Sequence, residues 1–192
     1  RGGVVRWGKR TGRSEMDNRD FLMSLSKEEL VELVGIYSRN MLAMDGVWFQ
    51  SVERKFGMDE AMRHDAEAWA RFTRTEARRI KKFLGLGEGS GLDGLEKALM
   101  LRFYANLNDS RIDREDGALY FTCVRCTVQE KRAEKGMPLH PCKPVGEIEY
   151  SGFADEIDGR IRCECVSCYP DLTDESCRCK WKFTVREDDE TR

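Results

Sequence analysis

Residues 160–185 read RIRCECVSCYPDLTDESCRCKWKFTV, a stretch in which two runs of strand-forming residues flank a polar segment that contains a proline. Residues 160–166 and 179–185 have the length and the aromatic and β-branched content that are typical of strands. We therefore expect the two runs to form a hairpin. Its base would carry Cys165 and Cys168 on one arm and Cys179 on the other.

The sequence before this hairpin predicts one more strand and two helices. Residues 118–124 have the composition of a strand, whereas residues 127–134 and 146–157 are expected to be helical. The stretch NDSRIDREDG, residues 108–117, is rich in turn-forming residues and is expected to break the helical pattern that precedes it. The C-terminal half is therefore predicted to be a small antiparallel sheet with helices.

The N-terminal half has helical periodicity. Ser26 and Glu29 form a capping box. Apolar residues follow at steps of three and four, namely Leu30, Leu33, Val34, Tyr37, Met41, Met44, Trp48 and Val52. This pattern predicts a long amphipathic helix with a bend at Gly46. Further helices are expected over residues 58–69, from a Thr73/Glu76 capping box to Gly85, and over residues 92–106.

Together these elements predict an α+β fold in which residues 26–186 form a single domain. Its helical part is expected over residues 26–107, and its cysteine-rich part over residues 117–186. Residues 1–25 are expected to be a disordered or artificial lead, and residues 187–192 a solvated acidic tail.

Composition narrows the classes of partner. A net charge of -2 and a pI near 5.9 provide no basic field for nucleic acid. The sequence has no apolar run long enough to predict a membrane span or a secretory signal. We expect a cytoplasmic protein with reduced thiols and a small organic molecule as its partner. The sequence leaves the formation of a homo-oligomer open.

All eight cysteines lie between residues 123 and 179, in the groups C-x-x-C at 123–126, a single Cys142, C-x-C-x-x-C at 163–168 and C-x-C at 177–179. Two C-x-x-C pairs with further cysteines nearby are typical of a tetrahedral thiolate metal site. Cys142 stands between two prolines, which predicts a fixed loop. The preferred ligands are Cys142, Cys165, Cys168 and Cys179, around zinc or an iron-sulfur cluster.

Other uses of the cysteines stay open at this point. Cys123 and Cys126 could close a zinc site with Cys165 and Cys168, and neighbouring thiols on one face of a strand could replace one another. Disulfides, inert buried thiols and a redox-active C-x-x-C pair are further alternatives. The roles of Cys163 and Cys177 are left undetermined.

Two carboxylates are candidates for catalysis. Asp45 falls on the apolar stripe of the first long helix, and Glu53 lies two turns further along it. A buried carboxylate beside aromatic side chains has a raised pKa and can act as a general base on water. The alternative is a carboxylate bonded to a neighbouring helix end. His140, two residues before Cys142, is either a ligand or a loop residue near the metal.

Several segments carry a resemblance to a known family: MDGVWFQSVERKFGMDEAMRHDAEAW, TEARRIKKFLGL, GLDGLEKAL, CTVQEKR, PCKPVGEIEYSGFADEIDGRI, CVSCYPD and CKWKF. Over about residues 28–186 the chain resembles a family of uncharacterised bacterial and archaeal cytosolic proteins. That family is related to the L-2-amino-thiazoline-4-carboxylic acid hydrolases. The resemblance implies hydrolysis of a carbon-nitrogen bond, beside a thiolate-bound zinc that is mainly structural.

The resemblance also sorts the cysteines. Cys126, Cys142, Cys165, Cys168 and Cys179 match the cysteine positions of the family, which implies that Cys126 is a fifth ligand or a reactive thiol, whereas Cys123, Cys163 and Cys177 are additions. The order of elements is similar to that of four-vinyl reductase domains, which implies a ligand pocket between the helical half and the sheet. The rival functions are a non-catalytic small-molecule sensor and an iron-sulfur protein.

Overall fold

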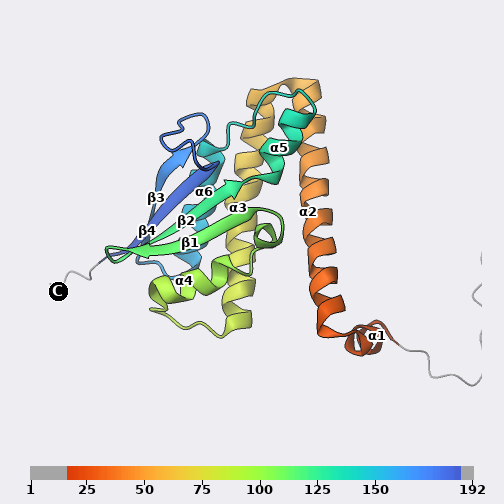
Figure 1. Ribbon diagram of the computed structural model, residues 1–192, viewed down its shortest axis with the longest axis vertical. Coiled ribbons are helices and arrows are strands. Elements are labelled where there is room, and N and C mark those ends of the chain that lie inside the picture. The colour runs from red at the N-terminus through yellow and green to blue at the C-terminus, as the bar shows by residue number, and fades with distance from the viewer. Residues whose placement is uncertain (1–16, 187–192) are drawn as a thin grey trace, which may run out of the picture.

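The computed structural model describes residues 17–186 (Figure 1). The predicted tail and residues 1–16 of the predicted lead lie outside the described residues, whereas residues 18–24 of that lead form a helix. The elements are, in chain order, the helices α1 (Asn18–Ser24), α2 (Lys27–Phe56), α3 (Met58–Leu84) and α4 (Gly91–Leu99), the 3₁₀ helix η1 (Phe103–Asn106), the strands β1 (Asp109–Glu115) and β2 (Ala118–Arg125), the helices α5 (Thr127–Glu134) and α6 (Lys143–Ile157), and the strands β3 (Ile161–Cys168) and β4 (Cys179–Val185). This arrangement confirms an α+β fold with a helical N-terminal half.

The sheet is antiparallel and has the strand order β1-β2-β4-β3. The three predicted strands and the hairpin of β3 and β4 are confirmed. The expectation that residues 108–117 form only a turn is wrong, because β1 pairs with β2 along its length. The turn is confined to Asp116 and Gly117, both with positive φ, as in a two-residue hairpin loop.

The core lies between the sheet and α6. Trp181 and Phe183 of β4 and Phe153 of α6 are fully buried, and the Tyr150 ring of α6 stacks on Trp181 at 4.7 Å between centroids. A Cβ on Gly146 would lie 2.6 Å from the Trp181 ring, so the absence of a side chain lets α6 approach the sheet. On the other face of the sheet, the ammonium groups of Lys180 and Lys182 lie over the Tyr120 ring.

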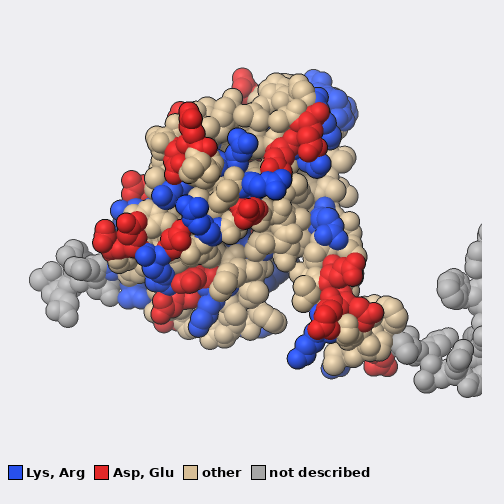
Figure 2. Space-filling view, viewed as in Figure 1, with Lys and Arg blue, Asp and Glu red and all other residues tan. Residues whose placement is uncertain are grey.

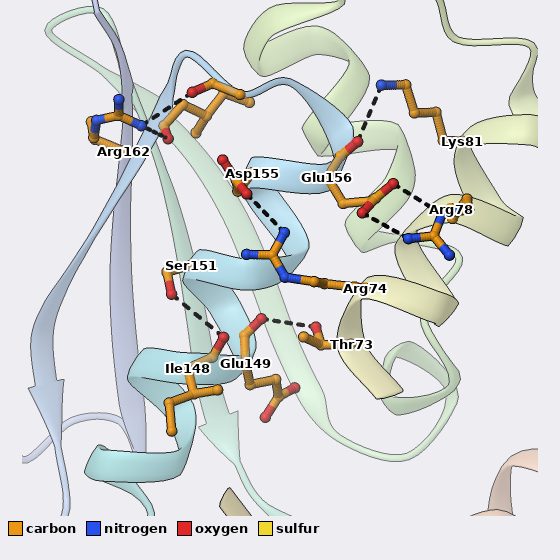
Figure 3. A network of polar contacts seen from close by, with 12 residues as sticks. Thr73, Arg74, Arg78, Lys81, Ile148, Glu149, Ser151, Asp155, Glu156 and Arg162 are labelled. Atoms are coloured by element: carbon orange, nitrogen blue, oxygen red, sulfur yellow. Dashed lines mark hydrogen bonds and ion pairs between the residues drawn. The ribbon is translucent and has the colours of Figure 1, made fainter. Parts of the chain in front are cut away.

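Helix α3 packs on α6 through a network of polar contacts (Figure 3). Thr73 is fully buried and donates its hydroxyl hydrogen bond to the carbonyl of Glu149 at 2.8 Å. Arg74 pairs with Asp155, and Arg78 with Glu156. The expected break between two helices near residue 70 is wrong, since α3 is continuous from Met58 to Leu84.

Helix α2 is a single helix that runs without interruption through the glycine at position 46. Its capping box at Ser26 and Glu29 is confirmed. Most of the apolar stripe that the sequence predicts is exposed, and only Ser38 and Phe49 of α2 are buried. No helix in the described part of the chain combines the length and apolarity required to cross a bilayer.

Candidate functional site

A cavity of about 470 Å³ lies between the helical half and the sheet, and is lined by residues of α2, α3, η1, α5, α6, β2, β3 and β4. This is where the sequence predicts a ligand pocket. Five large aromatic side chains line it: Phe49, Trp69, Tyr104, Tyr150 and Trp181. The volume suits a small organic molecule.

Five cysteine residues line the same cavity. Three of them stand in one row across the sheet, because Cys179 of β4 is paired in register with Cys123 of β2 on one side and with Cys168 of β3 on the other. The other two are N-caps, Cys126 of α5 and Cys142 of α6. A sheet row and two helix ends therefore meet around one end of the cavity.

The five thiols shift one another's pKa values. Those of Cys123 and Cys168 are raised by their cysteine neighbours, Cys126 and Cys179 for the first and Cys142 and Cys179 for the second. The same pairs lower the pKa values of Cys126 and Cys179, and that of Cys142 falls to about 6 although burial opposes it. The positive ends of the α5 and α6 dipoles favour negative charge at the same place. The arrangement therefore favours thiolates at Cys126, Cys142 and Cys179.

The loop over residues 135–142 is held in place by Gln129 of α5. Its side-chain amide donates to the carbonyl of His140 at 2.7 Å and to Sγ of Cys142 at 2.9 Å, and its Oε1 accepts from the backbone N–H of His140 at 3.0 Å. Gln129 is buried. These three contacts fix the positions of His140 and Cys142 relative to α5.

Another part of the cavity wall is acidic. Asp65 of α3 pairs with Nε2 of His140 at 3.2 Å. Burial opposes a charged imidazole, but Asp65 and Cys142 raise the pKa of His140 to about 9. Asp45 of α2 also lines the cavity, and burial together with the charge of Asp65 raises its pKa to about 6. The cavity therefore combines a carboxyl group that titrates near neutrality with a charged ion pair.

All eight cysteines are free thiols. As the side chains stand, residues 17–186 contain no group of three or more His, Cys, Asp or Glu arranged to hold a metal ion.

The model of a family of unknown function, DUF6125, matches residues 23–185, which is most of the chain. The chain belongs to this family. No curated protein and no solved structure matches the sequence. Nothing in these comparisons links the DUF6125 chain to the L-2-amino-thiazoline-4-carboxylic acid hydrolases, so that resemblance stays a prediction.

Three of the four preferred metal ligands of the DUF6125 chain, Cys142, Cys168 and Cys179, come together at the cavity. The fourth, Cys165, does not line it. Cys165 is paired in register with Trp181, two residues along β4 from Cys179, and burial raises its pKa to about 11 although Lys143 opposes this. Cys123 and Cys126, which lie outside the preferred set, line the cavity in its place.

The two candidate bases have different surroundings. Asp45 lines the cavity, and burial raises its pKa to about 6. Glu53 is not among the lining residues, and it accepts two hydrogen bonds from Arg132, at 2.9 and 2.6 Å. The pKa of Glu53 is lowered, first by these bonds. Its carboxylate therefore joins α2 to α5 and is a weak base.

Sequence reasoning missed the contributions of Asp65 and Gln129. Asp65 lies on α3 and Gln129 on α5, and polar residues are common on helices. Neither residue belongs to a recognisable motif. The only available signal was the position of His140 two residues before a cysteine, which indicates that a second group must orient the imidazole.

Proposed function

We propose that this protein binds a small organic molecule in the cavity beside a thiolate-bound zinc ion, with the metal at the end where the five thiols meet. The observation that carries the proposal is the convergence of Cys123, Cys168 and Cys179 from three strands with Cys126 and Cys142 from two helix ends. Buried free thiols are common singly. Five that interact from five elements beside a cavity are better explained by a shared ligand.

The ligands of the proposed site are Cys142, Cys168 and Cys179, with a fourth thiolate from the pair Cys123 and Cys126. Zinc and thiolate sulfur atoms bond at about 2.3 Å in a tetrahedron, which places the sulfur atoms about 3.8 Å apart. Each cysteine has a single side-chain torsion, χ1, so rotation between staggered positions would turn the sulfur atoms toward one centre.

The cavity supports an organic ligand. Asp45 has no hydrogen-bond or ion-pair partner among the described residues, and Nδ1 of His140 is buried there without a hydrogen-bond partner. Buried polar groups without partners are uncommon and costly. A ligand with an apolar body and polar groups directed toward Asp45 and His140 would satisfy both.

The test of the metal is elemental analysis with an absorption spectrum, on protein purified without oxygen. We expect about one zinc per chain and no visible bands. Cys168→Ser should lose the metal, whereas Cys165→Ser, on the same strand but outside the cavity, should keep it. Loss in Cys165→Ser with retention in Cys168→Ser would overturn this ligand set. If the analysis finds iron with acid-labile sulfide, the group bound at these thiols is an iron-sulfur cluster and not zinc.

Hydrolysis of a carbon-nitrogen bond is the second candidate function, and the position of Asp45 favours it. In this reaction Asp45 accepts a proton from water, the water oxygen bonds to the carbon atom, and the carbon-nitrogen bond breaks as nitrogen takes up a proton. Asp45→Asn would abolish turnover of cyclic and linear amidine and amide substrates while leaving metal content unchanged. Saturable binding without turnover in the wild type would identify a sensor.

A further inference from the structure

Helix α2 presents a row of large apolar side chains to solvent. We define the α2 stripe as Val34, Tyr37, Met41, Met44 and Trp48, which follow one another at steps of three, four, three and four residues. Their exposed fractions run from 39 % for Met41 to 70 % for Trp48. Alternating steps of three and four residues are the spacing by which two helices pack along a common seam.

The exposed area is large for a surface helix. With about 150–250 Å² for a large side chain, the five side chains of the stripe present roughly 500–600 Å² at their exposed fractions. A patch of this size commonly marks an interaction site. It is about two thirds of the ~800 Å² that each partner contributes to a stable protein interface.

The surroundings of the stripe leave room for a second helix. In Figure 1, α2 lies along the outer edge of the molecule, and its N-terminal half stands away from the sheet. The stripe residues Met44 and Trp48 do not line the cavity, whereas Val34 and Tyr37 border an open pocket between α2, α3 and η1. A partner on this face would therefore cover surface that the fold of one chain leaves exposed.

The charges of α2 favour one particular occupant. The charges at both ends are mixed, but the first turns are acidic on balance and the last turn is basic: Lys27, Glu28, Glu29 and Glu32 at one end, and Glu53, Arg54 and Lys55 at the other. Figure 2 shows acidic side chains over the lower end of α2 and basic side chains over the upper end. A second copy of α2 running antiparallel would set acidic end against basic end, and would also oppose the two helix dipoles. A parallel copy would bring like charges together.

We propose that the protein is a homodimer in which the α2 stripes of two copies pack antiparallel about a two-fold axis near Met41. Such an interface is self-complementary, because each stripe residue on one side of the axis meets a stripe residue from the other side. Val34 of one copy lies near Trp48 of its partner, and Tyr37 near Met44. The proposal of this interface does not rest on the proposed function of the cavity.

Sedimentation of the whole chain tests the dimer. We expect a mass of about 44 kDa, twice the 22.2 kDa of one chain. Met44→Glu places two like charges in the apolar seam and should raise the dissociation constant about 100-fold or more. Phe83→Glu alters a side chain that is 80 % exposed on α3, outside the stripe, and should leave the constant within about threefold. A monomeric wild type, or a dimer unaffected by Met44→Glu, would overturn the proposal.

Zero-length cross-linking of carboxylates to lysines tests the orientation without any variant. Within one helix, Lys55 lies 23 or more residues from Glu28, Glu29 and Glu32, a distance of about 35 Å or more at 1.5 Å per residue. A peptide that joins Lys55 to one of these acids therefore comes from two copies. We expect such peptides from the wild type and their loss in Met44→Glu. A dimer without them refutes the antiparallel arrangement.

Discussion

The close approach of α6 to the sheet makes Gly146 a test of how firmly the cavity wall is packed. In Gly146→Ala the new methyl carbon would lie 2.6 Å from Cζ2 and 2.9 Å from Cη2 of Trp181. Trp181 is 1 % exposed and stacked on Tyr150, so it has little room to move. Overpacking of this kind costs about 1–3 kcal/mol, and the better helix propensity of alanine returns up to about 1 kcal/mol. We expect a net loss of about 1–2 kcal/mol in the free energy of unfolding.

Gly46→Ala is the matched control for this prediction. Gly46 also lies inside a helix, but a Cβ there would meet only Nε2 of Gln50, at 3.9 Å. The substitution should stabilise the protein by about 0.5–1 kcal/mol. Urea denaturation followed by far-ultraviolet circular dichroism measures both variants. If Gly146→Ala is as stable as the wild type, α6 can shift on the sheet and the wall is softer than the contacts indicate.

Two further predictions concern buried charges. Burial raises the pKa of Glu149 to about 7 although Arg102 opposes this, so the pKa in the folded protein lies above the ordinary value of 4.5. Stability should therefore be full below about pH 4.5 and decline as the pH rises through about 7, by a few kcal/mol at most. Glu149→Gln should flatten this decline in urea denaturation at about pH 5 and pH 8, and an unchanged profile would assign the dependence to another group. Arg132 is 5 % exposed and paired with Glu53, so Arg132→Met should cost about 3–5 kcal/mol because a mostly buried carboxylate loses its partner. Arg125→Met breaks the exposed pair with Glu130 and should cost at most about 1 kcal/mol, so similar losses in the two variants would contradict this reasoning.

Much of the fold could be predicted because strand and helix composition agreed with the tertiary structure. The failures have particular causes. β1 has a single apolar residue, Ile112, and becomes a strand because the Asp116-Gly117 turn returns the chain onto it as β2. Thr73 and Glu76 match a capping motif, but in the structure they bond to Glu149 and Arg102, residues distant in sequence. A local motif cannot reveal that its polar groups have distant partners.

Which cysteines come together depends on the register of β2, β3 and β4, and this register cannot be read from the spacing of cysteines in the sequence. Cys165 and Cys168 are three residues apart and would face opposite sides of a regular strand. An irregularity between Cys165 and Ser167 changes the pairing, so that Cys165 is opposite Trp181 and Cys168 is opposite Cys179. Cys123 joins the row through the pairing of β2 with β4. Counting spacings therefore selected three of the thiols that line the cavity, and as the fourth a neighbour of Cys168 on the same strand that does not line it.

The proposed ligand site and the proposed dimer interface both involve α2. The helix supplies Asp45 to the cavity, while Met44 and Trp48, one residue before it and three after it, belong to the stripe on the exposed side. Within one chain this part of α2 is held by the buried ring of Phe49 and by the pair between Glu53 and Arg132. A second copy packed on the stripe would restrain the same turns from outside. Dissociation of the dimer should therefore loosen the cavity wall, and Met44→Glu should weaken binding of any ligand that contacts Asp45, although Met44 itself does not line the cavity.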